Sequence, residues 1–218
     1  MKFQRLTYLF GTEGLDKLSK AKVAIVGLGG VGGTAAISLV RSGIGNIIIC
    51  DFDIIEESNI NRQIVANSFN IGMYKTDCLE KLIHEINPAC QIKKLTQKVD
   101  EKLFDEKPQF VIDAIDDVPS KISLIKMCIK ENIPFISSMG AAKKVDPQKV
   151  EITTLKKTSY DPIARILRRE FKNHDFPVVS STEEALIRDL GSYMPVTSTF
   201  GLLLSDYCIK EILKKGKE

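Results

Sequence analysis

The sequence contains no Cys-x-x-Cys pair anywhere along its length. Structural zinc ribbons and thioredoxin-like redox sites both need such pairs, so neither is expected. The cysteines are five in number, an odd count, and most lie in apolar stretches: Cys50, Cys78, Cys90, Cys128 and Cys208. That placement is typical of small buried hydrophobic side chains in a reducing compartment.

Long hydrophobic runs are absent as well. No apolar stretch reaches the roughly 18 residues that a membrane-spanning helix needs. Charged residues are spread through the first twenty positions, which leaves no apolar segment of the kind found in signal peptides. We therefore expect neither a transmembrane helix nor a signal peptide, and we predict a cytoplasmic protein.

Histidine is scarce, and the two histidines have no suitable companions. Neither His84 nor His174 has a serine, aspartate or metal-ligand partner at a useful spacing. A Ser-His-Asp hydrolase and a histidine metal site are thus unsupported, and both residues are predicted to be structural or on the surface. Cys208 lies within an apolar helical pattern and is predicted to be a core residue, with no catalytic role.

The overall composition is that of an ordinary globular protein. Apolar residues make up 44% of the 218 positions, charged residues make up 27%, and the net charge is +3. A charge this small does not by itself indicate a nucleic-acid partner. No repeat, low-complexity tract or linker divides the chain, so a single domain over residues 1–218 is predicted.

The first two thirds alternate between strand and helix patterns. Short apolar runs predict strands at residues 23–26, 46–50, 90–95, 110–114 and 134–137. Helical periodicity predicts helices at residues 30–42, 75–86 and 120–130. This order indicates an α/β fold: a doubly wound, Rossmann-like, mostly parallel sheet with helices on both faces. In such a sheet the ligand binds beyond the carboxyl ends of the strands.

The last third has a different pattern. Residues 149–155 alternate as in an added strand, and Asp161-Pro162 is typical of a helix start that opens a basic helix to about residue 172. Residues 180–192 are polar and receive no assignment, and residues 196–213 predict a long helix that packs back on the sheet. We expect an extension from about residue 145 that covers the sheet and the substrate site.

A glycine-rich segment, Gly27-Leu28-Gly29-Gly30-Val31-Gly32, follows the first predicted strand and opens a helix. The glycines allow a tight turn and let phosphate groups approach the helix N-terminus. Asp51 ends the next strand, where a carboxylate can bind a ribose hydroxyl. Gly27, Gly29, Gly30, Gly32 and Asp51 therefore form a candidate nucleotide site. A purely structural glycine turn is the alternative, and the motif does not distinguish a dinucleotide from ATP.

A polar cluster after the second strand favours phosphoryl chemistry. Asp51-Phe52-Asp53 is followed by Asn59-Ile60-Asn61-Arg62-Gln63. A hydride-transfer enzyme needs nothing similar there, whereas an arginine near the phosphate site stabilises charge that develops at phosphorus. A solvated loop is the alternative.

These motifs, together with Lys75 and the segment Asp113-Ala114-Ile115-Asp116-Asp117, resemble the ThiF/MoeB/HesA superfamily of ubiquitin-activating-enzyme-like adenylyltransferases. They occur in that family's order over about half the chain. The resemblance implies a ThiF-type ATP-binding adenylation domain that uses ATP and Mg²⁺ to convert a carboxylate into an acyl adenylate. Repulsion between the carboxylate and a phosphate has to be neutralised by cations in such a reaction.

The resemblance also implies a role for each matched residue. Asp53 would hold the ribose, and Asp116 would bind Mg²⁺. The triphosphate would contact Asn59, Arg62 and Gln63, with Lys75 on the α-phosphate side. Arg62, Lys75 and Asp116 would be the catalytic residues, and Arg5 would reach the ATP of a neighbouring subunit. Two alternatives remain open: a helix N-cap for Asp116 or Asp117, and a solvated position for Lys75.

Further segments resemble one branch of the superfamily, the tRNA threonylcarbamoyladenosine dehydratases. They lie at residues 3–11, 135–141, 145–147, 157–165 and 178–184, so the resemblance covers nearly the whole chain. The branch implies adenylation of the threonylcarbamoyl carboxylate on an adenosine beside the tRNA anticodon. Ring closure then expels AMP, with a net loss of water.

A tRNA substrate calls for a basic surface. The candidates are Lys143, Lys144, Lys156, Lys157, Arg165, Arg168, Arg169 and Lys172. The last four follow helical spacing and would line one face, although such a stripe is also typical of a solvated surface. The resemblance implies a homodimer, and it leaves open a sulfur-relay protein partner and a monovalent cation (Na⁺ or K⁺).

Three other functions compete with this one. The first is an adenylyltransferase that activates the C-terminal carboxylate of a sulfur-carrier protein or a peptide, although the zinc cysteines typical of carrier activators are missing. The second is an NAD-dependent oxidoreductase that uses the glycine loop. The third is a non-catalytic partner-binding module that retains the fold.

Overall fold

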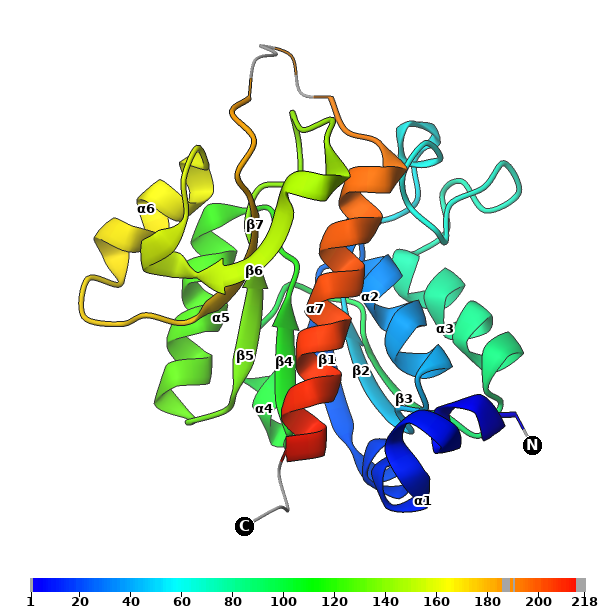
Figure 1. Ribbon diagram of the computed structural model, residues 1–218. Helices are drawn as coiled ribbons and strands as arrows, with labels where there is room; N and C mark the ends of the chain where they lie inside the picture. The colour runs from blue at the N-terminus through cyan, green and yellow to red at the C-terminus, as the bar shows by residue number, and fades with distance from the viewer. Residues whose placement is uncertain (1, 186–188, 190, 215–218) are drawn as a thin grey trace.

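A seven-stranded sheet runs through the middle of the molecule, with strand order β3-β2-β1-β4-β5-β7-β6 (Figure 1). The computed structural model describes residues 2–185, 189 and 191–214. The strands are β1 (Lys22–Val26), β2 (Asn46–Cys50), β3 (Gln91–Leu95), β4 (Phe110–Asp113), β5 (Phe135–Ser138), β6 (Val150–Thr154) and β7 (Pro177–Ser181). All neighbouring strands pair in parallel except β6, which runs antiparallel to β7.

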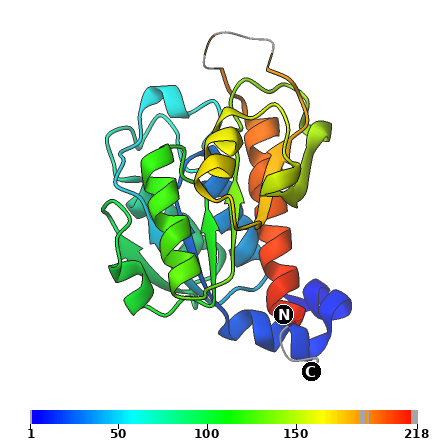
Figure 2. The same cartoon turned by 90° about the vertical axis from the view of Figure 1, so that its left-hand side faces the viewer.

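Helices cover both faces of the sheet, as the sequence predicts. They are α1 (Gln4–Lys20), α2 (Gly30–Arg41), α3 (Lys75–Ile86), α4 (Lys102–Asp105), α5 (Val118–Lys130), α6 (Pro162–Glu170) and α7 (Met194–Lys214). Three short 3₁₀ turns, η1 (Glu57–Asn59), η2 (Pro147–Lys149) and η3 (Leu155–Lys157), lie in the connections. Figure 2 shows α5 and α6 together on one face, where their residues share one apolar core. Residues of α2, α3 and α7 share the core on the other face.

The inner strands separate two apolar cores. In β1, Val23 and Ile25 pack with α2 and α7, whereas Ala24 and Val26 pack with α5. Successive side chains of a strand point to opposite faces, so a strand covered on both sides needs a continuous apolar sequence. This requirement explains why residues 23–26 and 47–50 are apolar at every position.

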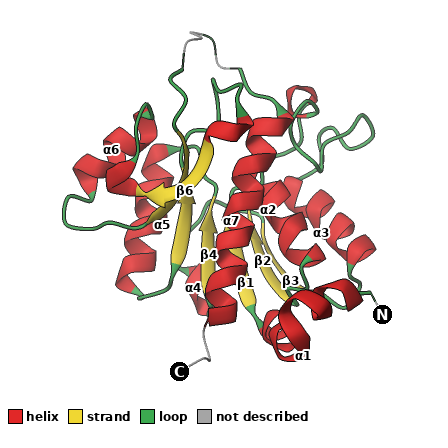
Figure 3. Ribbon diagram, in the orientation of Figure 1, coloured by secondary structure: helices red, strands yellow, loops and turns green. Residues whose placement is uncertain are grey.

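The sheet changes direction between β1 and β4. From β1 the chain winds outward through β2 to β3, then crosses to β4 and winds the other way. Val26 and Asp113 are partners in register at the carboxyl ends of these two strands. A crevice opens at such a switch point, and ligands of doubly wound sheets bind there. Figure 3 shows the loops that follow the parallel strands gathered at this end of the sheet.

Three helices and strands were not predicted from the sequence: α1, the short helix α4, and β7. Helix α1 covers residues that received no assignment, and it contains a break at Gly11, where φ is 71°. Strand β7 falls partly in the polar stretch left unassigned, because Ser180 and Ser181 are polar and yet buried. The remaining predicted strands and helices are confirmed, with ends that differ by up to two residues.

The C-terminal third extends the sheet and also covers it. Strands β6 and β7 add to the edge beside β5, and α7 lies across the face that carries α2 (Figure 1). Helix α7 approaches α2 closely, since a Cβ on Gly201 would lie 2.4 Å from the carbonyl oxygen of Val31. That this extension also covers a substrate site stays a prediction.

All five cysteines are buried, as predicted. Burial raises the pKa of Cys50 to about 12 and that of Cys90 to about 11. Cys208 is fully buried within α7. A thiol with such a pKa is not a nucleophile near neutral pH.

Candidate active site

The loop between β1 and α2 depends on glycine for its shape. Gly27 has a φ of +87°, and a Cβ on it would lie 2.6 Å from the carbonyl oxygen of Ala114. A Cβ on Gly32 would collide with the carbonyl oxygen of Gly27 at 1.7 Å. The loop is therefore folded back on itself and packed against the residue that follows β4.

Gly29 faces open space instead. A Cβ built there meets a single atom within 4 Å, the Nε2 of Gln63, at 3.9 Å. Gln63 is buried, and its Oε1 is one of the buried side-chain atoms in the described residues that have no hydrogen-bond partner. A buried acceptor without a donor is costly, so a ligand with a donor group that approaches the loop would satisfy it. The N-terminus of α2 adds backbone N–H groups that favour an anion.

Asp51 holds this loop in place. Its Oδ2 accepts the N–H of Leu28 at 2.6 Å, and its Oδ1 accepts the N–H of Asp53 at 2.8 Å. Burial raises the pKa of the Asp51 carboxyl, and the two backbone N–H groups act in the opposite direction. Both oxygens are thus engaged by the backbone. This arrangement favours a positioning role for Asp51 over the direct nucleotide contact predicted for it.

Lys75 and Asp53 form an ion pair beside the loop. The Lys75 Nζ lies 2.7 Å from Asp53 Oδ2, and the Lys75 N–H donates to the Asp53 carbonyl oxygen at 3.0 Å. The lysine side chain is only 8% exposed, whereas that of Asp53 is 47% exposed. The alternative of a solvated lysine is therefore wrong. Asp53 keeps one accessible carboxylate oxygen, which can accept a hydrogen bond from a hydroxyl group.

The cluster at residues 59–63 packs against the start of α2, where a Cβ on Gly30 would lie 2.9 Å from the Arg62 carbonyl oxygen. Asn59 is buried and takes part in a capping box with Glu56, whose N–H donates to Asn59 Oδ1 at 3.2 Å. The side chain of Asn59 thus shapes the turn, which leaves little of it for the triphosphate contact predicted for it.

Arg62 remains able to bind an anion. Its Nη1 donates to the Ser58 carbonyl oxygen at 2.7 Å and to Asn61 Oδ1 at 2.9 Å. The other N–H groups of the guanidinium make no hydrogen bond within the described residues. The two contacts hold the side chain in place without neutralising its charge, because neither partner is a carboxylate.

Two neighbouring carboxylates after β4 have different roles. Asp117 is the N-cap of α5, and its Oδ2 accepts the N–H of Ser120 at 2.9 Å. Asp116 is exposed and makes no hydrogen bond or ion pair to any described residue. Of the two aspartates that the sequence offers as the N-cap of this helix, Asp117 is the cap and Asp116 is not.

Asp116 suits a metal that is also held by phosphates. Mg²⁺ is usually bound by one or two carboxylates together with phosphate oxygens and water. Within the part of the chain that the structure describes, no group of three or more His, Cys, Asp or Glu side chains could hold a metal. The donor set at Asp116 therefore fits Mg²⁺ bound with a nucleotide, and the Mg²⁺ contact itself stays a prediction.

A buried charged cluster at Asp113, three residues before Asp116, was not predicted from the sequence. The Nζ of Lys121, on α5, lies 2.7 Å from Asp113 Oδ2, and both side chains are almost completely buried. Ser137 donates to the same oxygen at 2.5 Å. The only signal in the sequence is that Lys121 shares a helix face with Leu124, Ile125 and Cys128, which are buried apolar residues.

Arg5 does not reach this site within its own chain. It lies in α1, which packs near the edge where the strands begin, whereas the glycine loop follows the end of β1 (Figure 1). Contact between Arg5 and a nucleotide would have to come from a second subunit, and it stays a prediction.

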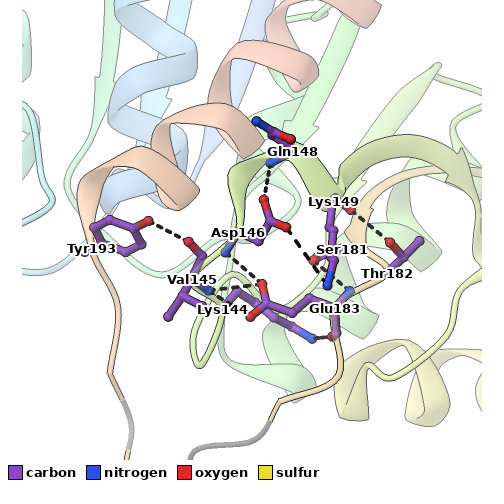
Figure 4. Close-up of polar contacts among 9 residues, drawn as sticks. All are labelled: Lys144, Val145, Asp146, Gln148, Lys149, Ser181, Thr182, Glu183 and Tyr193. Atoms are coloured by element: carbon purple, nitrogen blue, oxygen red, sulfur yellow. Dashed lines mark hydrogen bonds and ion pairs between the residues drawn. The ribbon is translucent and has the colours of Figure 1, made fainter.

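One predicted tRNA contact, Lys144, is corrected by the structure. Its side chain is buried, its Nζ donates to the carbonyl oxygen of Glu183, and burial lowers its pKa. The Glu183 carboxylate in turn accepts the N–H groups of Val145 and Asp146, and the Tyr193 hydroxyl donates to the Val145 carbonyl (Figure 4). Lys144 thus joins two loops to each other and is not available to a phosphate.

The basic stripe is also shorter than predicted. Helix α6 ends at Glu170, so Lys172 lies beyond it, and Arg168 is turned inward to the carbonyl and hydroxyl of Thr158. Lys143 is half-buried in the loop, with its N–H on the Gly191 carbonyl oxygen. Five cations remain exposed with no hydrogen bond or ion pair from their side chains among the described residues: Lys156, Lys157, Arg165, Arg169 and Lys172.

The model of the ThiF family matches residues 2–218. The chain belongs to the ThiF family, in the branch of the tRNA threonylcarbamoyladenosine dehydratases. The Bacillus subtilis tRNA threonylcarbamoyladenosine dehydratase is 35% identical over 97% of this chain and 94% of its own length. The Escherichia coli enzyme of this name, solved in complex with ATP, has a TM-score of 0.94 and 33% identity, over 98% of this chain and 94% of that one.

An adenylyltransferase is also similar to the chain. A molybdopterin-synthase adenylyltransferase of Haemophilus influenzae is 32% identical over 94% of this chain and 80% of its own length. Membership of the family thus agrees with the resemblance carried by the motifs. In the part of the chain that the structure describes, every helix is too short or too polar to span a bilayer.

Proposed function

We propose that the protein is an ATP-dependent dehydratase of tRNA, which cyclises threonylcarbamoyladenosine through an acyl-adenylate intermediate. One observation carries the proposal. The open glycine loop, the Lys75–Asp53 pair and the unpartnered Asp116 surround a single switch point, in a chain that matches dehydratases over nearly their whole length. The function is that of an ATP-dependent, adenylate-forming tRNA-modifying enzyme.

The residues at the switch point suit an attack by a carboxylate on the α-phosphate of ATP, which forms the acyl adenylate and releases pyrophosphate. The N-terminus of α2 receives the phosphates, and Asp53 accepts a ribose hydroxyl. Arg62 and Lys75 supply positive charge against the repulsion between the two anions, and they stabilise the charge that develops at phosphorus. Asp116 would hold Mg²⁺, which adds further positive charge at the triphosphate when it is bound.

The second half of the reaction needs little from the protein. Once the carboxylate is an adenylate, a nitrogen or oxygen of the same group attacks its carbonyl, and AMP leaves as the ring closes. The reaction is intramolecular, so its effective concentration is high. No cysteine thioester is required, in agreement with the burial of all five thiols.

The five exposed cations named above would contact the tRNA backbone, and we refer to them as the α6 basic surface. Asp161 anchors this region to the active-site side of the sheet. It caps α6 through the N–H of Ala164 and accepts the N–H of Gly140, which follows β5. Phosphates bound at this surface would lie beside the strand end next to β4.

A homodimer would complete the site if Arg5 of one subunit approached the nucleotide of the other. The proposal also includes a single adenylation domain over residues 1–218 and a cytoplasmic location. It further includes a bound monovalent cation (Na⁺ or K⁺) and a sulfur-relay protein partner. These parts rest on the family resemblance.

The test is ATP–pyrophosphate exchange with purified protein. We expect exchange that depends on Mg²⁺ and is stimulated by tRNA that carries threonylcarbamoyladenosine. Unmodified tRNA is the matched control, because it offers the same backbone without the carboxylate. Exchange stimulated by a sulfur-carrier protein and not by modified tRNA would favour the alternative function, which is activation of a carrier protein. The similarity to a molybdopterin-synthase adenylyltransferase is the reason to test this alternative.

A further inference from the structure

Lys121 carries a fully buried positive charge at the end of the sheet. Its side chain is 0% exposed, and it points from α5 to the carboxyl ends of β4 and β5. The ammonium has three acceptors: Asp113 Oδ2 at 2.7 Å, the Ser138 carbonyl oxygen at 2.9 Å and Ser137 Oγ at 3.2 Å. All three N–H groups of Lys121 are thus engaged, and they join a helix to two adjacent strands.

Asp113 passes this connection on to the turn after β4. Its Oδ1 accepts the N–H of Ile115 at 3.1 Å, while its Oδ2 receives Lys121 and Ser137. The carboxylate therefore fixes the direction in which the chain leaves the strand. Asp116 follows one residue after Ile115, so its position depends on this turn.

The same turn supports the glycine loop. Ala114 donates its N–H to the Val26 carbonyl oxygen at 2.8 Å, and its own carbonyl oxygen is the atom that a Cβ on Gly27 would meet at 2.6 Å. A short segment thus contacts the phosphate loop on one side and presents Asp116 on the other. Any change in its path would move these two parts of the site relative to each other.

A buried ion pair is weak evidence of a contribution to stability. Buried charges lose their hydration, and well-packed apolar residues of similar volume are often as stabilising as the pair they replace. Each partner also needs the other, because a single buried charge is strongly unfavourable. A fully bonded cluster at the switch point therefore suggests a role in geometry.

We propose that Lys121 is a positioning residue, which acts through Asp113 to hold the turn at residues 113–116 so that Asp116 and the glycine loop bind one metal–nucleotide complex together. The inference rests on the proposed function, since it assumes Mg²⁺ and ATP at this site. It assigns to Lys121 no contact with substrate.

The test uses two variants of the full-length protein. Lys121→Met removes the charge at similar volume but leaves Asp113 buried without its cation, so this variant alone could fail to fold. Asp113→Asn with Lys121→Met removes both charges and keeps an oxygen for the Ile115 N–H. Ser38→Ala with Ser205→Ala is the matched control, because it removes a 2.7 Å polar contact between α2 and α7.

The main readout is binding of a non-hydrolysable ATP analogue, measured by calorimetry with and without Mg²⁺. In the double variant at positions 113 and 121 we expect apparent Mg²⁺ affinity to fall by roughly 10- to 100-fold, the range found when residues that orient a metal ligand are replaced. Binding of the analogue without Mg²⁺ should change much less. Hydrogen exchange at Ile115 should become faster, and the serine control should alter neither quantity.

Two results have separate meanings. If the folded double variant keeps wild-type Mg²⁺ affinity and wild-type exchange at Ile115, the positioning role is wrong and the cluster is only structural. If the wild-type protein itself gains no affinity for the analogue from Mg²⁺, or Asp116→Ala retains that gain, the assignment of the metal site in the proposed function fails instead.

Discussion

The ammonium of Lys75 lies 2.7 Å from the Asp53 carboxylate, and the backbone of the same two residues is hydrogen-bonded as well. One partner is buried and the other is half exposed. The pair therefore holds a cation at the edge of the glycine loop while an oxygen of Asp53 remains open to a ligand.

Replacement of Lys75 should affect catalysis more than folding. We expect Lys75→Met to reduce the rate of adenylation by about 100-fold or more, because a cation that stabilises charge at phosphorus is lost. Single-turnover formation of AMP from ATP and modified tRNA measures this step. Lys94→Met is the control, since Lys94 forms surface ion pairs with Asp77 and Glu80. An equal loss in both variants would argue against the special role of Lys75.

Substitution of each of the two adjacent aspartates after β4 should distinguish metal binding from helix capping. Asp116→Asn should raise the Mg²⁺ concentration needed for half-maximal activity by roughly tenfold or more, since a metal-binding carboxylate becomes neutral. Asp117→Ala should leave that concentration unchanged and lower the melting temperature, because α5 loses its N-cap. Mg²⁺ titrations and thermal unfolding of both variants distinguish the two roles.

The effect of Asp117 should also depend on pH. Hydrogen bonds from Ser120 hold the pKa of Asp117 below its usual range in the folded protein. The ionised carboxylate therefore favours the folded state at neutral pH, and this contribution is lost as the pH falls through the lowered pKa. The difference in melting temperature between wild type and Asp117→Ala should accordingly disappear under strongly acidic conditions. A difference that persisted there would contradict the capping role.

The α6 basic surface should bind the tRNA backbone. We expect Arg165→Glu with Arg169→Glu to weaken tRNA binding and to reduce the salt dependence of binding by a slope of about 2, one unit for each lost phosphate contact. Lys81→Glu with Lys102→Glu makes the same change in net charge at exposed positions elsewhere. Lys144→Met should not alter the salt slope, because Lys144 is buried against Glu183. Filter binding at several salt concentrations provides the comparison, and equal effects of the two charge reversals would rule out a specific surface.

Thiol chemistry should have no part in the reaction. Burial raises the pKa of Cys50 to about 12 and that of Cys90 to about 11, and all five cysteines are buried. Alkylating reagents act on thiolates, so the native protein should react slowly and keep its activity. Activity measured after treatment with iodoacetamide, alongside mass spectrometry of the intact protein, tests this expectation. Rapid inactivation that follows modification of one cysteine would show a catalytic thiol.

Much of the fold could be predicted because local patterns and long-range packing agree. Residues 46–50 and 75–86 were predicted at the bounds that the structure has. Strand β7 was missed because its serines are polar, although the strand is buried between β5 and β6. Helix α1 carries a break at Gly11, which interrupts the periodicity that marks a helix.

The motifs of the candidate site could be predicted from the sequence. The role of each side chain within them could not, because it depends on long-range contacts that a sequence does not show. Nothing local indicates that Asp51 is engaged by two backbone N–H groups or that Lys144 is buried. Lys121 has no motif at all, because its partners come from two other strands. Long-range hydrogen bonds thus decide which residues of a motif remain free for a ligand.

The central claim is best tested by mass spectrometry of the nucleosides of tRNA that carries threonylcarbamoyladenosine, after incubation with the protein, ATP and Mg²⁺. The account predicts that the modified nucleoside loses the mass of one water, that the loss requires ATP, and that Arg62→Ala abolishes it. An unchanged nucleoside, in the presence of a protein that binds ATP, would contradict the assignment of tRNA as the substrate.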